Sequence, residues 1–165
     1  MSGSNAFGAP PRAEGVPVSG VYYNRASSLI VGGEAGTVAG VGGLSIGRFA
    51  WAAPDGRCLN QRTSDQDLLG LVVWQGGDWR RVFWDEVTFS WKIREGMNVT
   101  LLTRAPGEWV RIPSGGQWGE AIYTSPLDGV PVAGYADGLE ATPWSLARPA
   151  RGDSLSLITT WNSVL

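Results

Sequence analysis

The fold class is decided most clearly by the stretch Val87-Thr88-Phe89-Ser90-Trp91-Lys92-Ile93. Its apolar residues occupy every second position, and the polar residues Thr88, Ser90 and Lys92 stand between them. Successive side chains of a β-strand point to opposite faces, so this period of two predicts a strand with one apolar and one polar face. The dipeptide Glu95-Gly96 predicts a turn directly after it.

Strand patterns separated by turn residues continue on both sides of this stretch. Toward the N-terminus, residues 44–53 are typical of a strand with two buried faces, and Pro54-Asp55-Gly56 predicts the turn that ends it. Residues 68–74 and 79–84 flank Gly76-Gly77-Asp78 and therefore predict a hairpin. Toward the C-terminus, further strands are expected at residues 99–103, 109–112, 121–124, 130–135 and 155–161.

Together these patterns predict an all-β protein. Turn signals recur roughly every 8–12 residues, and no window has the 3.6-residue period of an amphipathic helix. We therefore expect an antiparallel β-barrel or β-sandwich, jelly-roll-like or tulip-like. Residues 1–20 predict an extended N-terminal arm, and residues 21–165, which have no break in composition, predict one β domain.

The arm is rich in Gly and Pro, and Pro10, Pro11 and Pro17 oppose helix formation. Two interpretations stay open for it. It is either a disordered tail or a segment that becomes ordered on a neighbouring subunit, with Phe7 and Arg12 as anchors.

The composition excludes several classes of function. Only 17% of the 165 residues are charged, against about 25% in an average soluble domain. This favours a protein with surface hidden in an assembly, and the alternative is a polar surface rich in Ser, Thr and Gly. The net charge is −2, and Arg80-Arg81 is the longest basic run, so we expect no nucleic-acid partner. No apolar run approaches the roughly 18 residues of a membrane span, so we expect no membrane partner.

The residues that usually carry catalysis or bind metals are scarce. The chain contains no His, and its one Cys, Cys58, can form neither an internal disulfide nor a cysteine-based metal site. Asp85 and Glu86 are adjacent in a predicted strand and would point to opposite faces, although a glycosidase needs two facing carboxylates. The Gly-rich residues 32–47 lack the lysine of a phosphate-binding loop. We therefore expect no catalytic residue, no metal and no cofactor.

The nine tryptophans are the strongest compositional signal. Most are expected in the core, because a buried aromatic side chain removes about 150–250 Å² from water. Trp74 and Trp79 flank a predicted Gly-Gly turn, and Trp118 stands in Gly-Gly-Gln-Trp-Gly-Glu, so these three are predicted at exposed or interface positions. Exposed tryptophans also stack on sugars, which leaves carbohydrate binding open.

One part of the chain resembles a known family. The segment Arg25-Ala26-Ser27-Ser28-Leu29, a Gly-rich stretch, the strand Leu44-Ser45-Ile46-Gly47-Arg48-Phe49-Ala50-Trp51 and the turn Pro54-Asp55-Gly56 are similar to the N-terminal signature of phage structural cement proteins. Residues 95–101 and 119–138 resemble later parts of that family more weakly. The resemblance covers about residues 24–138 and carries no catalytic motif.

The resemblance implies a decoration protein on the outer surface of an icosahedral phage capsid, in the virion. Its partners would be the major capsid protein and itself, as a homo-oligomer with a trimer favoured over a dimer. The predicted interface residues are Phe7, Arg12, Tyr22, Tyr23, Arg25, Trp74, Trp79 and Trp118. The alternative is a carbohydrate-binding, or weakly hydrolytic, β domain of a phage virion.

Overall fold

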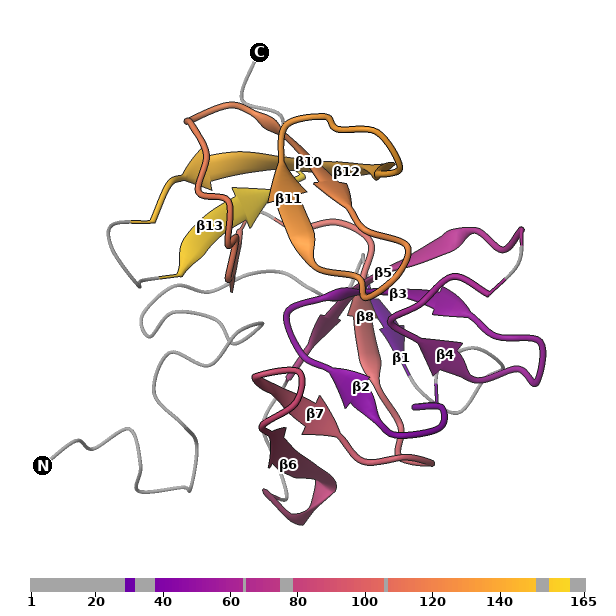
Figure 1. The fold of residues 1–165 in the computed structure, drawn as a ribbon. Coiled ribbons are helices and arrows are strands. Elements are labelled where there is room, and N and C mark those ends of the chain that lie inside the picture. Colours follow the sequence, from indigo (N-terminus) through magenta and orange to yellow (C-terminus); the bar gives the residue numbers. More distant parts are fainter. Residues whose placement is uncertain are drawn as a thin grey trace, which may run out of the picture.

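A computed structural model describes residues 29–31, 38–63, 65–74, 79–105, 107–150 and 155–160. The described residues form three antiparallel sheets, and their one helical element is the short 3-10 turn η2, Trp79–Arg81. The prediction of an all-β, antiparallel protein is therefore confirmed. In Figure 1 one five-stranded sheet lies at the top, a three-stranded sheet lies at the bottom, and a second five-stranded sheet lies between them.

The middle sheet has the strand order β1-β8-β5-β3-β4. These strands are β1 (Leu29–Val31), β8 (Thr100–Leu102), β5 (Leu68–Val73), β3 (Phe49–Ala52) and β4 (Cys58–Leu59). Its central strands have apolar residues on both faces: Leu71 and Val73 of β5 face the upper sheet, and Val72 faces the lower sheet. A sheet that is covered on both faces needs nearly continuous apolar strands, and Leu68–Val73 has that sequence.

The upper sheet has the order β11-β10-β12-β13-β9. Its strands are β11 (Pro131–Ala133), β10 (Ala121–Thr124), β12 (Glu140–Arg148), β13 (Ser156–Thr159) and β9 (Glu108–Val110). Together with the middle sheet it encloses the first core, which includes Trp51, Leu102, Ile122, Trp144 and Ile158. Because each buried tryptophan contributes on the order of 4–6 kcal/mol as an upper bound, Trp51 and Trp144 dominate this core.

The lower sheet has the order β2-β7-β6, with β2 (Leu44–Ser45), β7 (Ser90–Ile93) and β6 (Val82–Asp85). Leu44, Val82 and Ile93 pair across the three strands and share one face. That face packs against the middle sheet and forms the second core with residues such as Val72 and Leu101. The three sheets are thus held by two cores that share the middle sheet.

Three polar contacts tie the upper sheet to β3 and to the segment that follows β4. The indole Nε1 of Trp51 donates a hydrogen bond to Glu140 Oε2 at 3.0 Å, and Glu140 Oε1 forms an ion pair with Arg62 Nη1 at 3.2 Å. In the turn between β10 and β11, the carbonyl of Gly129 accepts a hydrogen bond from the backbone N–H of Phe49 at 2.8 Å. The buried indole donor is therefore satisfied, and the turn is docked on the middle sheet.

Three sequence expectations about the strands are wrong, one about pairing and two about where strands begin and end. The predicted hairpin of residues 68–74 with 79–84 does not form, because β5 pairs with β3 and β8 whereas β6 pairs with β7. The predicted strand 44–53 is interrupted by a turn at residues 46–47. In the stretch 87–93, only Ser90–Ile93 is strand, and residues 86–89 form the turn between β6 and β7.

Candidate interaction site

The hairpin of β6 and β7 carries a cluster of aromatic side chains. Trp84 lies opposite Trp91 in the ladder, and their rings meet edge to face with centroids 5.6 Å apart. The carbonyl of Trp91 accepts a hydrogen bond from the N–H of Ile46, so its backbone faces β2 rather than β6. Trp84 and Trp91 are therefore a non-hydrogen-bonded pair, the geometry in which side chains approach most closely, and they stabilise the hairpin.

Residues 86–89 form the turn at the end of this hairpin, which we call the hairpin tip. Val87 is 92% exposed and Phe89 is 60% exposed. Phe89 has a φ of 52°, in the left-handed region, which costs a residue with a Cβ about 1–2 kcal/mol. Its edge-to-face contact with Trp84, at 5.0 Å between centroids, contributes about 0.5–1.5 kcal/mol. The contact with Trp84 roughly offsets the cost of the backbone conformation. Exposing the two apolar side chains of the hairpin tip therefore adds little to the stability of the fold.

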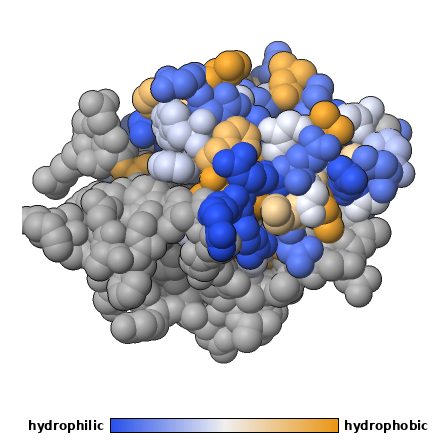
Figure 2. Space-filling view, turned by 90° about the horizontal axis from the view of Figure 1, so that it is seen from below, coloured by the Kyte–Doolittle hydropathy of each residue, from blue (hydrophilic) through white to orange (hydrophobic). Residues whose placement is uncertain are grey.

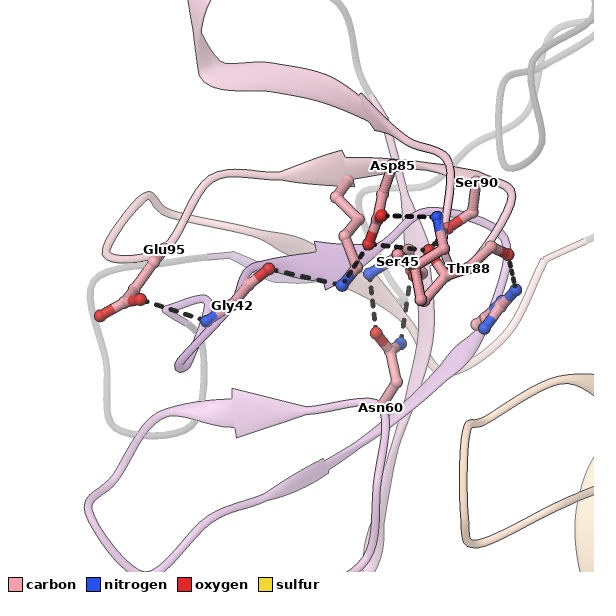
Figure 3. A network of polar contacts seen from close by, with 10 residues as sticks. Gly42, Ser45, Asn60, Asp85, Thr88, Ser90 and Glu95 are labelled. Carbon is pink, nitrogen blue, oxygen red and sulfur yellow. Dashed lines mark hydrogen bonds and ion pairs between the residues drawn. The ribbon is translucent and has the colours of Figure 1, made fainter.

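A network of polar contacts fixes the hairpin tip (Figure 3). Asp85 Oδ1 accepts the N–H of Val87 at 2.9 Å, and Asp85 Oδ2 accepts the hydroxyl of Thr88 at 3.1 Å. The carbonyl of Thr88 accepts a hydrogen bond from Arg48 Nη2 at 2.7 Å. Both ends of the turn are therefore held by side chains, one from β6 and one from the segment before β3.

The network continues from the hairpin tip into the body of the protein. Thr88 and Ser90 share a hydrogen bond between their hydroxyls at 2.8 Å, and Ser90 in turn contacts the hydroxyl of Ser45 at 2.9 Å. Asn60 Oδ1 accepts the N–H of Ser45 at 2.7 Å, and Asn60 Nδ2 donates to the carbonyl of Phe49 at 3.1 Å. Figure 3 shows this chain of contacts running from the hairpin to Asn60, after β4. The tip is thereby anchored to the lower and the middle sheet.

The electrostatics of this network favour a structural role. Hydrogen bonds from the backbone of Val87 and from Lys92, whose Nζ lies 3.1 Å from Asp85 Oδ2, lower the pKa of Asp85 below its ordinary value. A carboxylate with a lowered pKa is a poor proton acceptor near neutral pH. Ser45 and Ser90 are buried and hydrogen-bonded to each other rather than to a base. The network is therefore suited to holding the turn and not to activating a nucleophile.

Another exposed aromatic side chain lies before β10. Trp118 is 74% exposed, and Gly115, Gly116 and Gly119 around it adopt positive φ angles. The N–H of Gln117 donates to Glu120 Oε1 at 2.6 Å, and the N–H of Gly119 donates to the carbonyl of Leu146 at 2.7 Å. Hydrogen bonds therefore hold the loop backbone at the residue before and the residue after Trp118. Further exposed apolar residues on turns and loops are Leu127 and Tyr135.

The structure places the predicted interface residues unevenly. Phe7, Arg12, Tyr22, Tyr23 and Arg25 lie outside the described residues. Trp118 is exposed, as expected for its Gly-rich loop, and its interface role stays a prediction. Trp79 begins the 3-10 turn η2. Trp74, expected to be exposed beside a turn, is only 6% exposed and belongs to the second core, because it continues the inward parity of Val72.

Sequence reasoning missed the hairpin tip as a candidate. The alternation of its residues predicts a strand, which would place Val87 and Phe89 on one buried face. The signal that could have located the turn is Asp85 two residues before Val87 and three before Thr88, because Asp side chains commonly bind the backbone two residues on.

The face of the molecule shown in Figure 2 has no continuous apolar surface among the coloured residues. Its hydrophobic residues form small patches that are separated by hydrophilic ones. A contact on such a surface depends on a few apolar anchors surrounded by polar residues.

Neither protein-family models nor curated proteins match the sequence. Within the described ranges, no group of three or more acidic or cysteine side chains is placed to hold a metal ion. The same ranges contain no helix that is both long and apolar enough to cross a membrane.

Proposed function

We propose that this protein is a non-enzymatic decoration protein, which binds the outer surface of an icosahedral phage capsid, bridges subunits of the major capsid protein and stabilises the shell. The single observation that carries the proposal is the hairpin tip, where a fixed turn presents Val87 and Phe89 to solvent. Preorganised apolar side chains are typical of binding surfaces, because little conformational entropy is lost when they are buried.

The resemblance of residues 24–138 to phage cement proteins supports the same reading. The proposal includes the finer architecture, in which the sheets form a β-barrel or β-sandwich. It also includes a homo-oligomer, with a trimer favoured over a dimer, and the virion surface as the place of action. We propose neither a nucleic-acid nor a membrane partner, and no cofactor.

The stabilising effect follows from mass action. A ligand that binds the assembled shell and not the free capsid subunits shifts the equilibrium toward the shell, and many weakly bound copies add up. The purified protein is mixed with empty shells of the major capsid protein from the same virus, and the shells are pelleted. We expect the protein to co-sediment at a saturable copy number and to raise the temperature at which shells dissociate. Protein that stays in the supernatant at all concentrations would refute the proposal.

Trp118 supports a second candidate function, the binding of carbohydrate. Its indole is exposed on a loop whose backbone is bound on both sides, and an exposed indole face can stack on a sugar ring. Titration with a panel of oligosaccharides, followed by tryptophan fluorescence, tests it against a Trp118→Ala control. Saturable quenching that the control lacks would favour this second function, whereas equal responses of both proteins would exclude Trp118 as a sugar platform.

A further inference from the structure

We infer that the hairpin tip is the main anchor of the proposed interaction and inserts Val87 and Phe89 into an apolar pocket of the partner protein, next to a positively charged residue. This inference rests on the proposed function and names the chemistry of the partner site.

The first reason to regard the hairpin tip as the anchor is the backbone conformation of Phe89. Its φ of 52° is a conformation in which hairpin turns normally place glycine or asparagine. An aromatic side chain is unfavourable there, and more than half of this one lies in solvent. Strained residues at exposed positions commonly mark contact sites, because the strained geometry aims the side chain. The edge-to-face contact with Trp84 leaves the residue 60% exposed.

The rigidity of the turn is the second reason. Asp85, Arg48 and the hydroxyls of Thr88 and Ser90 hold the backbone of the hairpin tip before any partner is present. A turn at the end of a two-stranded hairpin is convex, so the matching surface is a pocket and not a second flat face. Side chains that are already held in place make stronger anchors than mobile ones.

The charge of the hairpin tip defines the rim of that pocket. The carboxylate of Asp85 is neutralised by Lys92. Glu86 is exposed, and no ion pair of its side chain is present among the described residues. One negative charge therefore stands beside the two apolar side chains, and an Arg or Lys at the edge of the partner pocket complements it.

The test uses the full-length protein and the shell-pelleting experiment, with three variants. Phe89→Gly removes the ring and suits the left-handed backbone, so the variant should fold with an unchanged urea midpoint. We expect it to bind shells about thirtyfold more weakly, as expected for a hot-spot side chain. Glu86→Lys should weaken binding about tenfold at low salt and by less at high salt. Leu127→Ser, which changes a 76% exposed apolar residue on another turn, is the matched control and should bind like the wild type.

The outcomes separate the inference from the proposed function. If the wild type pellets with shells and Phe89→Gly pellets equally well, the proposed function stands and the hairpin tip is not the anchor. If Leu127→Ser loses as much binding as Phe89→Gly, the interaction is a general apolar one and the inference is wrong. If Glu86→Lys binds shells as tightly as the wild type at low salt, the partner pocket has no positively charged rim. If the wild type does not bind shells, both the function and the inference are overturned.

Discussion

Replacing Gly129 by Ala tests the junction between the upper and the middle sheet. Gly129 has a φ of 73°, and a Cβ added there would overlap the carbonyl oxygen of Phe49 and lie 3.1 Å from that of Asn60. Both atoms belong to the backbone, so the turn between β10 and β11 must move away from β3 by roughly 1 Å to reach an ordinary contact distance. That movement breaks the hydrogen bond from Phe49 N–H to Gly129, which leaves a buried donor unsatisfied at a cost of about 1–3 kcal/mol. The positive φ adds about 1–2 kcal/mol, so we expect a total destabilisation of about 2–5 kcal/mol.

Gly138→Ala is the matched control for this substitution. Gly138 has a φ of 85°, but no atom lies within 4 Å of the position that a Cβ would take, so only the cost of the backbone conformation applies. Both changes reduce the entropy of the unfolded chain equally, and that effect cancels between them. In urea unfolding followed by tryptophan fluorescence, an m value of about 2 kcal/mol/M converts these costs into midpoint shifts of about 1–2.5 M for Gly129→Ala and about 0.5–1 M for Gly138→Ala. Equal shifts would refute the close approach of the turn to β3.

Two further predictions concern titratable groups. Burial raises the pKa of the Cys58 thiol to about 12, so an aromatic disulfide reagent at pH 8 should label it at least about a hundredfold more slowly in the folded protein than in urea; complete labelling within minutes in native buffer would contradict this. The pKa of Asp85 is lowered by its contacts with Val87 and Lys92, so its stabilising contribution is fully present above the unfolded pKa of about 3.9 and is lost as the pH falls through the folded pKa. The urea midpoints of wild type and Asp85→Asn should therefore differ most at pH 7, and the difference should shrink as the pH falls below about 3.9. A difference that does not depend on pH would count against the contacts of Asp85.

Alternation predicts strands well in this chain where tertiary contacts do not interrupt them. The sequence predicts a strand at residues 121–124, and β10 has those bounds. The same rule is wrong at Val87 and Phe89, because Asp85 binds the backbone of Val87 and turns the chain. A period of two shows which residues alternate. It does not reveal a side chain such as that of Asp85, which accepts a backbone hydrogen bond that strand pairing would otherwise use.

The longest strand, β12, is not predicted by the sequence, and Pro143 is the reason. A proline within an apolar run argues against a strand that is paired on both sides. Here the pairing of β10 with β12 is irregular between the pairs Ala121–Ser145 and Tyr123–Ala141, and Pro143 lies within that irregularity. The hydroxyl of Thr142 donates to the carbonyl of Ile122 at 2.6 Å and accepts the N–H of Trp144 at 3.1 Å. The side chain of Thr142 thus supplies contacts next to Pro143, which has no N–H to donate. Residue propensities alone do not predict such a substitution.

The order of the sheets also changes what the composition implies about function. A low charged fraction and 43% hydrophobic residues favour a protein with surface buried in an assembly. The middle sheet, however, is covered on both faces, and two cores absorb apolar residues that a single sheet with one wet face would not need. Trp74 illustrates this, because a residue expected at an interface is buried in the second core. The two cores account for many of the apolar residues, so the composition supports assembly less strongly once the fold is known. The proposed assembly therefore rests on the few apolar side chains that the fold leaves in solvent, above all Phe89, which is 60% exposed and has a positive φ.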